Sequence, residues 1–591
     1  MRKYVKRATI MFAAALACTL AAGSVSAKKE PVNRVIVFGD SLSDGGFYVA
    51  LDPTIPAGAG SFTTNPDPVA PEVVASELNL TLDTAYGADG TNYAVGGARV
   101  SEPNLLSVPI ATQAAGFAAT ERFFNSDDLV YIQGGGNDFF AYVADGATDT
   151  SILTNAATEL AELVDLLGRS GARRVVTMSV QSVGVAGGLL FNQTYEDELA
   201  ALGVNALYFD MDALFDEVIA DTATFGITNT VDVACTDSSL ICTPDSYVAT
   251  DANETYLRAD SVHPAGITQR IQGEAIASLL LAPDQIGQLA YAAEALFDGQ
   301  RALHRQVMHN GLGQGQGNTA IYGAIGHHTF DNTGSGQRIG VEEDGVASNV
   351  AIDHQFGETL GAGFSFAYST GDGSFDRNRG GYDVDAMAGS LYVRGQFSSI
   401  RVSGDLTYGR VNYDSLSRNV TLGPAARVHE GDTDGTYTAL HMDASYPVFA
   451  NDFVQLAFET TLAHNDSNID GYSESTQLST AATFGSQGLR NTIAGLGIAV
   501  QSAGERRVGY HVQANYKHEF GRVRDISITP VGAPISYTSE IYSADADYVS
   551  YDLGIALRVN QAVSVRAGLS GYALRGDLDS HNIFVSAIIA L

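Results

Sequence analysis

The sequence has little cysteine, little positive charge and, beyond its first residues, no long apolar run. It carries 33 Lys and Arg against 67 Asp and Glu, a net charge of −34. Because nucleic acid is bound by a basic face, this balance argues against nucleic acid as a partner. Without a long apolar segment there is no transmembrane helix in the mature chain, so any membrane-spanning part must be a β-barrel.

The long apolar stretch that does occur is at the N-terminus. A basic start over residues 1–7 precedes an apolar run over 8–22 and the small residues at 25–27. The run is too short for a membrane span and ends in a small-residue cleavage site, so residues 1–27 are predicted to be a secretory signal peptide.

Three cysteines are present, and cleavage of the signal peptide would remove Cys18. Cys235 and Cys242 then remain in an exported, oxidising setting, where we expect them to close a small disulfide loop. Two unrelated thiols are the alternative. The pair lacks the spacing and the His partners of a zinc site, and no metal is expected.

At 591 residues the chain is too long for one core, and its first part has an α/β pattern. From Arg34 to about Leu281, short apolar runs alternate with amphipathic stretches, which predicts a parallel sheet covered by helices. Strands are expected at 35–38, 129–133, 174–179 and 206–209, and helices at 71–78, 152–167, 213–221 and 265–281.

A different pattern begins after Pro283. Residues from Asp284 to about His309 predict one helix, with Pro283 and Asp284 suited to its first turn. Beyond Gly313 about twelve segments alternate between apolar and polar residues, the period of a transmembrane barrel strand. In one of them the residues that share the apolar face are Tyr551, Leu553, Ile555, Leu557 and Val559.

The connections between these segments alternate in length. Short turns are expected near Gly357, Ser399, Asn451, Gly504 and Asn560, and long polar loops near Gly336, Gly380, Pro424, Gln477 and Pro534. Short periplasmic turns and long external loops are typical of a bacterial outer-membrane barrel, with a soluble β-sandwich as the alternative. A barrel with an even number of strands whose last strand ends in the periplasm also begins in the periplasm. The preceding helix must then thread the lumen, leaving the first domain outside.

One serine stands where an α/β sheet places its ligands. Ser41 follows the first predicted strand, within Gly39-Asp40-Ser41-Leu42, and the carboxyl ends of parallel strands form the ligand edge of such a sheet. The segment does not match the G-x-S-x-G turn of the α/β-hydrolases, because position 43 is Ser.

One histidine can activate this serine. His263 is the only histidine before His304, and it follows Asp260 by three residues, so both side chains can project from one turn. In that arrangement the carboxylate orients the imidazole, which takes the serine proton. A lone histidine is more often structural, but the Asp-x-x-His-Pro context and the upstream serine favour the catalytic interpretation.

Two glycine-rich segments could supply donors to a developing oxyanion. They are residues 92–98 and 133–138, in which glycine allows close backbone approach and Asn137 offers a neutral amide. Ordinary strand-to-helix turns are the alternative. Neither segment has the Lys-Ser/Thr ending of a phosphate-binding loop.

These four segments, in this order, closely resemble the GDSL family of lipases and esterases, also called SGNH hydrolases. The resemblance implies a flavodoxin-like sheet with Ser41 as nucleophile and Asp260 and His263 as the other triad members. It further implies oxyanion donors from the N–H of Ser41, the N–H of Gly97 and the amide of Asn137. No cofactor is implied.

The order of signal peptide, passenger, lumen helix and barrel resembles the autotransporter family. The expected domains are a signal peptide over 1–27, a hydrolase passenger over 28–282, a linker helix over 283–312 and a twelve-stranded antiparallel barrel over 313–591. The resemblance implies outer-membrane lipid and the outer-membrane assembly machinery as partners, and a passenger exposed at the cell surface.

The expected function is therefore that of a cell-surface serine esterase or lipase acting on acyl esters or lipids. A phospholipase or acyltransferase would use the same residues. A surface adhesin that keeps the hydrolase fold is the alternative from another class, and a pore is disfavoured by the lumen helix.

Overall fold

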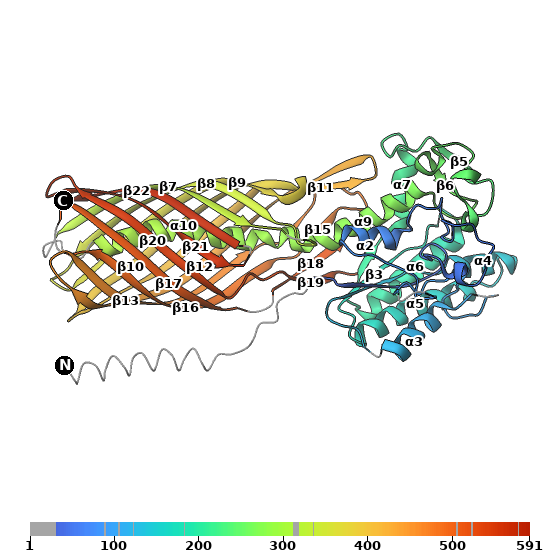
Figure 1. Cartoon of the computed structure of the whole chain (residues 1–591), viewed down its shortest axis with the longest axis horizontal. Coiled ribbons are helices and arrows are strands. Elements are labelled where there is room, and N and C mark those ends of the chain that lie inside the picture. Colours follow the sequence, from blue (N-terminus) through green and yellow to red (C-terminus); the bar gives the residue numbers. More distant parts are fainter. Residues whose placement is uncertain are drawn as a thin grey trace.

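The computed structural model describes residues 31–310 and 318–591, apart from 88–89, 105–106, 122, 183, 335, 504–505, 522–523 and 577. The predicted signal peptide and the turn residue Gly504 lie outside the described residues. Figure 1 shows an elongated molecule in which a barrel holds one end and an α/β domain the other. Among the described residues, no helix has the length and apolar character needed to cross a membrane.

The α/β domain, or passenger, is built on a parallel sheet in the order β1-β2-β3-β4. These strands are Arg34–Phe38, Asp128–Ile132, Arg174–Met178 and Leu207–Phe209. A short segment around Asn92 pairs in parallel with Val37 on the outer side of β1. Counting this segment as a rudimentary second strand gives the order 2-1-3-4-5, that of a flavodoxin-like fold. The predicted α/β class is confirmed.

Helices cover both faces of the sheet because successive residues of a buried strand point to opposite sides. Val35 and Val37 of β1 pack toward α2, α7 and α9, whereas Ile36 and Phe38 pack toward α3, α5 and α6. These helices are α2 (Ala70–Glu77), α3 (Ile110–Glu121), α5 (Ser151–Arg169), α6 (Ala186–Leu202), α7 (Met211–Ala220) and α9 (Gly266–Ile286). The sequence pattern did not predict α3 or α6.

The carboxyl edge of the sheet carries the smaller elements. They are η1 (Phe47–Ala50), α4 (Gly136–Ala144), β5 (Asn229–Val233), η2 (Ser239–Ile241), η3 (Pro244–Ser246), α8 (Ala252–Thr255) and β6 (Tyr256–Arg258). In Figure 1, α4, β5 and β6 lie at the end of the passenger that points away from the barrel.

The second domain is a closed barrel of twelve strands, as predicted. The barrel strands in chain order are β7 (Thr319–Asn332), β8 (Val341–Gln355), β9 (Leu360–Phe375), β10 (Gly380–Phe397), β11 (Ile400–Leu422), β12 (Ala425–Ala450), β13 (Val454–Ile469), β16 (Gln487–Ser502), β17 (Val508–Phe520), β20 (Asp547–Arg558), β21 (Val563–Arg575) and β22 (Leu578–Ala590). The alternation is confirmed in β20, where Leu553 and Ile555 are exposed outside while Asp552 is buried inside.

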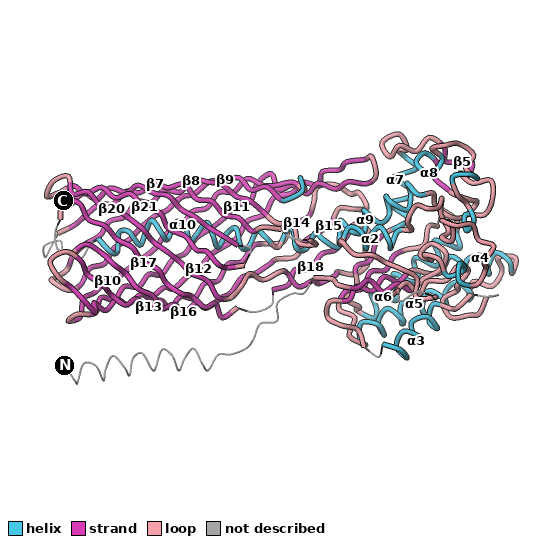
Figure 2. Tube along the Cα trace, in the orientation of Figure 1, coloured by secondary structure: helices cyan, strands magenta, loops and turns pink. Residues whose placement is uncertain are grey.

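Helix α10 (Gln288–Asn310) runs along the barrel axis and fills the lumen (Figure 2). Polar side chains of the wall hold it: the Tyr413 hydroxyl donates to the Leu289 carbonyl over 2.6 Å, and Arg301 pairs with Asp443 over 3.1 Å. Phe297 also stacks on Tyr437, with ring centroids 4.3 Å apart.

The predicted start of the lumen helix was wrong. Pro283 lies inside α9 rather than in the first turn of the next helix, and only Gly287 separates α9 from α10. A proline inside a helix removes one hydrogen bond, but the helix resumes because the Gly287 N–H donates to the Pro283 carbonyl over 3.0 Å. Side-chain volume also requires glycine here, because a Cβ on Gly287 would lie 2.5 Å from Ile541.

Two of the predicted long loops are instead long hairpins. The connections near Gly380 and Pro424 are short, but β11 and β12 extend to a tight turn at 423–424 beside α9. The strands β11 and β12 are long here because the hairpin that they form packs on the passenger. The Gly423 N–H donates to Glu274, and Pro424 lies against Gly226.

A small sheet joins the two domains at this end. It consists of β14 (Tyr472–Ser473), β15 (Ala482–Phe484), β18 (Arg524–Pro530) and β19 (Tyr537–Ile541). Ser479 donates to Glu217 of α7 over 2.9 Å, Arg173 pairs with Glu540 over 3.1 Å, and Ile535 is buried in the passenger core. The passenger is therefore docked on the barrel through packed and charged contacts.

Candidate active site

Ser41 lies in the tight turn that leaves β1, and its side chain is largely buried at 8% exposure. The turn is fixed from within, because the Leu42 N–H donates to the Asp40 carboxylate over 3.0 Å. From α3, the Gln113 side chain accepts from the Gly39 N–H and donates to the Gly39 carbonyl, both over 2.9 Å. Gln113 has no sequence motif, and its role could not be predicted.

The structure brings Ser41, Asp260 and His263 together. Both oxygens of the Asp260 carboxylate lie 2.9 Å from His263 Nδ1, and His263 Nε2 lies 2.8 Å from Ser41 Oγ. An ionised carboxylate can only accept, so Nδ1 carries the proton and Nε2 is left to accept from the serine hydroxyl.

Asp260 is ionised in this arrangement. Burial acts to raise its pKa, but hydrogen bonds from His263 and Ser239 and the electrostatic effect of the adjacent imidazole outweigh burial and hold the pKa of Asp260 well below its usual range. The same carboxylate also accepts from the backbone N–H groups of Val262 and His263, over 2.9 and 2.8 Å, which fixes the Asp-x-x-His turn.

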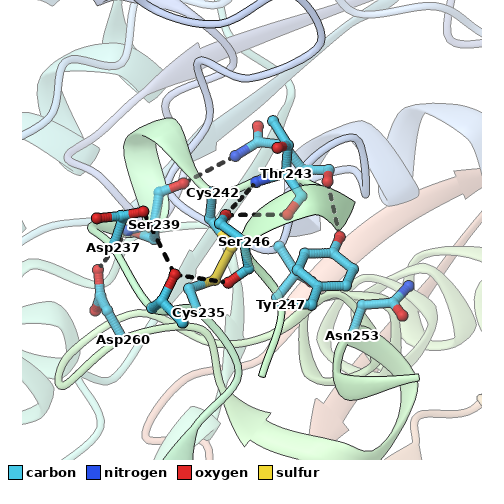
Figure 3. The surroundings of a disulfide bond; sticks show 12 residues. Cys235, Asp237, Ser239, Cys242, Thr243, Ser246, Tyr247, Asn253 and Asp260 are labelled. Atoms are coloured by element: carbon cyan, nitrogen blue, oxygen red, sulfur yellow. Dashed lines mark hydrogen bonds between the residues drawn. A yellow bond between two sulfur atoms is a disulfide. The ribbon is translucent and has the colours of Figure 1, made fainter. Parts of the chain in front are cut away.

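Ser239 is a further residue at this pair that sequence reasoning missed. Its N–H donates to Asp260 over 3.1 Å, and its Oγ lies 3.1 Å from His263 Nδ1. It belongs to the loop closed by the disulfide between Cys235 and Cys242, whose Cα atoms are 5.8 Å apart (Figure 3). The only sequence signal for Ser239 was its place between the two cysteines.

The structure separates the two glycines that are candidates for an oxyanion donor. The Gly96 N–H is already used, since it donates to the Asp44 carboxylate over 2.8 Å. Asp44 is fully buried, and burial raises its pKa to about 6, against hydrogen bonds from Phe47, Gly46 and Gly96. Gly97 has a φ of +79°, a backbone conformation that favours glycine, and its N–H remains the candidate donor.

Asn137 lies beside this glycine turn, in the first turn of α4. Its amide donates to the Ala98 carbonyl over 3.0 Å, one residue beyond Gly97. The neighbouring Asp138 accepts from Arg99 Nε over 2.9 Å and from the Val100 N–H over 3.0 Å, which ties the glycine turn to α4. The N-terminus of α4, the positive end of its helix dipole, also points toward the glycine turn at Gly97.

An aromatic wall covers the imidazole. The ring of Phe62 lies 4.9 Å from the ring of His263, and Tyr48 packs edge-on against Phe62 while its hydroxyl donates to the Gly96 carbonyl over 2.8 Å. The wall limits water access on one side of the imidazole. Among the described residues, no three His, Cys, Asp or Glu side chains gather as a metal site would require.

Two protein families match the chain, one for each domain. Residues 35–276 match the GDSL-like Lipase/Acylhydrolase family, and residues 321–570 match the Autotransporter beta-domain. The chain joins a GDSL-like lipase/acylhydrolase domain to an autotransporter β-domain. This GDSL autotransporter is an ester hydrolase of the outer membrane with an exposed passenger, as the sequence predicted.

Similar proteins extend along the whole chain. Esterase EstA of Pseudomonas aeruginosa is 26% identical, over 93% of this chain and 95% of that protein. Lipase 1 of Photorhabdus luminescens is 23% identical over 98% of each. The solved translocator domain of autotransporter NalP from Neisseria meningitidis aligns with 51% of this chain and 98% of its own, at 16% identity and a TM-score of 0.40.

Proposed function

We propose that the GDSL autotransporter hydrolyses carboxylic esters at the cell surface through an acyl-enzyme on Ser41. The observation that carries the proposal is the hydrogen-bonded series from Ser41 Oγ to His263 Nε2 over 2.8 Å and from His263 Nδ1 to Asp260 over 2.9 Å. A serine hydroxyl is a weak nucleophile until a base takes its proton, and the imidazole is placed for that task.

The reaction follows in two halves. His263 takes the proton of Ser41 as Oγ attacks the ester carbonyl carbon, and the imidazolium returns this proton to the departing alcohol. Water then gives a proton to His263 and attacks the acyl-enzyme, and the carboxylic acid leaves as Ser41 regains its hydrogen. Asp260, ionised beside Nδ1, stabilises the imidazolium in both halves.

The oxyanion is assigned to the N–H groups of Ser41 and Gly97 and to the Asn137 amide. Replacing Asn137 with Ala should lower kcat by about 10²–10³ with a smaller change in KM, because the donor acts mainly on charge that develops in the transition state. Hydrolysis by solubilised full-length protein measures this effect. An unchanged kcat would remove Asn137 from the oxyanion site.

The substrate class is an acyl ester or a lipid, and outer-membrane lipid is both the surroundings of the barrel and a candidate substrate. The names of Esterase EstA and Lipase 1 support this class. We further propose the signal peptide over 1–27, the passenger over 28–282, the barrel over 313–591 and a linker over 283–312 that begins in the last turn of α9 and contains α10. Insertion by the outer-membrane assembly machinery belongs to the same proposal.

Hydrolysis of p-nitrophenyl esters of graded chain length by whole cells tests the proposal. Ser41→Ala and His263→Ala should each abolish activity at unchanged surface level, while Ser170→Ala, at an exposed passenger serine, should keep it. Hydrolysis that persists in Ser41→Ala would contradict the proposal. A folded, exported but inactive wild type would instead favour the adhesin alternative.

A further inference from the structure

The disulfide loop over residues 235–242 lies beside Asp260 (Figure 3). Ser239 of this loop is within hydrogen-bond distance of both Asp260 and His263. Resting on the function proposed above, we propose that Ser239 is a positioning residue for this pair and that the disulfide between Cys235 and Cys242 holds Ser239 in place. The loop then contributes to turnover and not only to the stability of the passenger.

Ser239 contacts both members of the pair at the side away from Ser41. Its backbone N–H donates to Asp260 Oδ2, and its Oγ, 3.1 Å from His263 Nδ1, accepts a second, shared bond from the proton that Nδ1 donates to Asp260. The side chain is fully buried, so water cannot take its place without an opening of the loop.

An imidazole held only by one carboxylate can still swing about the bond to its Cβ. A second acceptor at Nδ1, off the line to the carboxylate, restricts this rotation and keeps Nε2 directed at Ser41 Oγ. Small losses of such alignment reduce rate strongly, because proton transfer requires hydrogen-bond geometry in the transition state. Ser239 does not reach the substrate side of the imidazole, so it should affect kcat rather than KM.

The disulfide fixes the two ends of the segment that carries Ser239. The Cys235 N–H donates to the Ala259 carbonyl over 3.0 Å, and the Ala259 N–H donates to the His263 carbonyl over 2.8 Å, so one cysteine is joined to the Asp-x-x-His turn itself. At the other end, the Cys242 N–H donates to the Ser239 carbonyl over 3.2 Å.

A separate segment, residues 60–65, covers the loop. The Asn65 amide donates to the Ser239 carbonyl over 2.8 Å, and the Gly60 N–H donates to the Leu240 carbonyl over 3.0 Å. The same stretch carries Phe62, whose ring lies over His263. The loop is thus enclosed between the aromatic wall and the catalytic turn, and both cysteines are buried in a small cluster of alanines.

The first experiment compares Ser239→Ala with Ser238→Ala in the full-length protein. Ser238 is the neighbouring residue, exposed on the same loop, and is the matched control. We expect Ser239→Ala to lower kcat about tenfold with KM unchanged, Ser239→Thr to restore much of the loss through its hydroxyl, and Ser238→Ala to behave as wild type.

Each kcat is expressed per site labelled by a fluorophosphonate, which bonds to Ser41 Oγ with loss of fluoride, so unfolded protein does not enter the value. An unchanged kcat in Ser239→Ala would overturn the positioning role alone. A wild type that neither hydrolyses esters nor labels would overturn the proposed function, and the positioning role with it.

The second experiment is a cycle between Ser239→Ala and the pair Cys235→Ser with Cys242→Ser. If the disulfide acts through Ser239, the triple variant loses no more kcat than the worse of its two parents, because the contact is already lost. A triple variant whose fold-loss of kcat equals the product of the losses in its two parents would overturn the link between the disulfide and Ser239. A drop in thermal stability with unchanged kcat in the cysteine variant would show that the disulfide is only structural.

Discussion

The passenger and the barrel of this chain differ in which side chains they bury. In the passenger, Ile36 and Val37 point to opposite faces of the sheet and both are buried among apolar side chains. In the barrel, Asp552 is buried toward α10, while Leu553 and Ile555 are exposed on the outer wall. The passenger therefore buries apolar side chains away from water. The barrel instead presents apolar side chains to lipid on its outer wall and polar side chains to its lumen.

The two domains also differ in what their charged side chains do. Asp260 of the passenger is ionised and pairs with one imidazole, which leaves Nε2 free for Ser41. Arg301 of α10 pairs with both Asp405 and Asp443, over 3.6 and 3.1 Å, and holds a helix in place. In the passenger a half-buried carboxylate therefore serves the candidate active site, whereas in the barrel buried ion pairs hold the lumen helix.

The largest effect should come from removing a core aromatic side chain of the passenger. Phe191 is fully buried and lies against Gly135, where a Cβ would be 2.2 Å from its ring. Phe191→Ala should cost about 3–5 kcal/mol and lower the temperature of half-inactivation by about 10 °C. Phe123→Ala, at 75% exposure, is the control and should change neither.

This variant separates the two domains, because only the passenger core is changed. The barrel should keep its resistance to unfolding in detergent, measured by heat-dependent gel mobility. A barrel that unfolds together with the passenger would show that the two domains share one folding unit.

A charge on the outer barrel wall should have the next largest effect. Ile555→Arg would place a guanidinium in lipid, which costs about 2–4 kcal/mol at the membrane midplane, and should reduce the amount of assembled barrel. Gln513→Arg is the matched control. Gln513 lies opposite Asp552 on the neighbouring strand, and both face the lumen, so an arginine at 513 can pair with that carboxylate. Equal loss in both variants would contradict the lipid-facing assignment.

The smallest effect concerns a buried acid of the passenger. Burial raises the pKa of Glu72 from 4.5 to about 7. Between these pH values the Glu72 carboxyl is ionised in the unfolded chain, whereas in the folded passenger it still holds its proton. Stability should therefore fall as the pH rises from 5 to 8, by about 2 kcal/mol from this group.

Glu72→Gln should flatten the profile, whereas Glu159→Gln, at an exposed carboxyl, should not. Residual activity after heating at each pH, assayed at one common pH, measures stability without the titration of His263. A profile that Glu72→Gln leaves unchanged would exclude this carboxyl as the source of the pH dependence.

Much of the fold could be predicted from the sequence, because its signals are local and periodic. The alternation around Leu553 and the apolar run at 35–38 each report the environment of one strand. The start of α10 could not be predicted, because α9 continues past Pro283 to Ile286 and the glycine that ends it packs against Ile541, far away in the sequence. Likewise the hairpin turn at 423–424 and the joining sheet depend on packing between distant parts of the chain.

The candidate site divides in the same way. Ser41, Asp260 and His263 lie in motifs, and the structure brings them within hydrogen-bond distance. Ser239 and Gln113 act through a turn that the disulfide closes and through a helix that packs on the Ser41 turn. Neither contact leaves a repeated pattern in the sequence, so tertiary structure was needed to find them.

The most direct test is to treat intact cells with a fluorophosphonate and locate the label by mass spectrometry of passenger peptides. We expect one phosphonyl group on Ser41, full access from outside the cell, and much slower labelling in Asp260→Asn and His263→Ala. A label on another residue, or labelling that appears only after the outer membrane is broken, would contradict a surface serine hydrolase centred on Ser41.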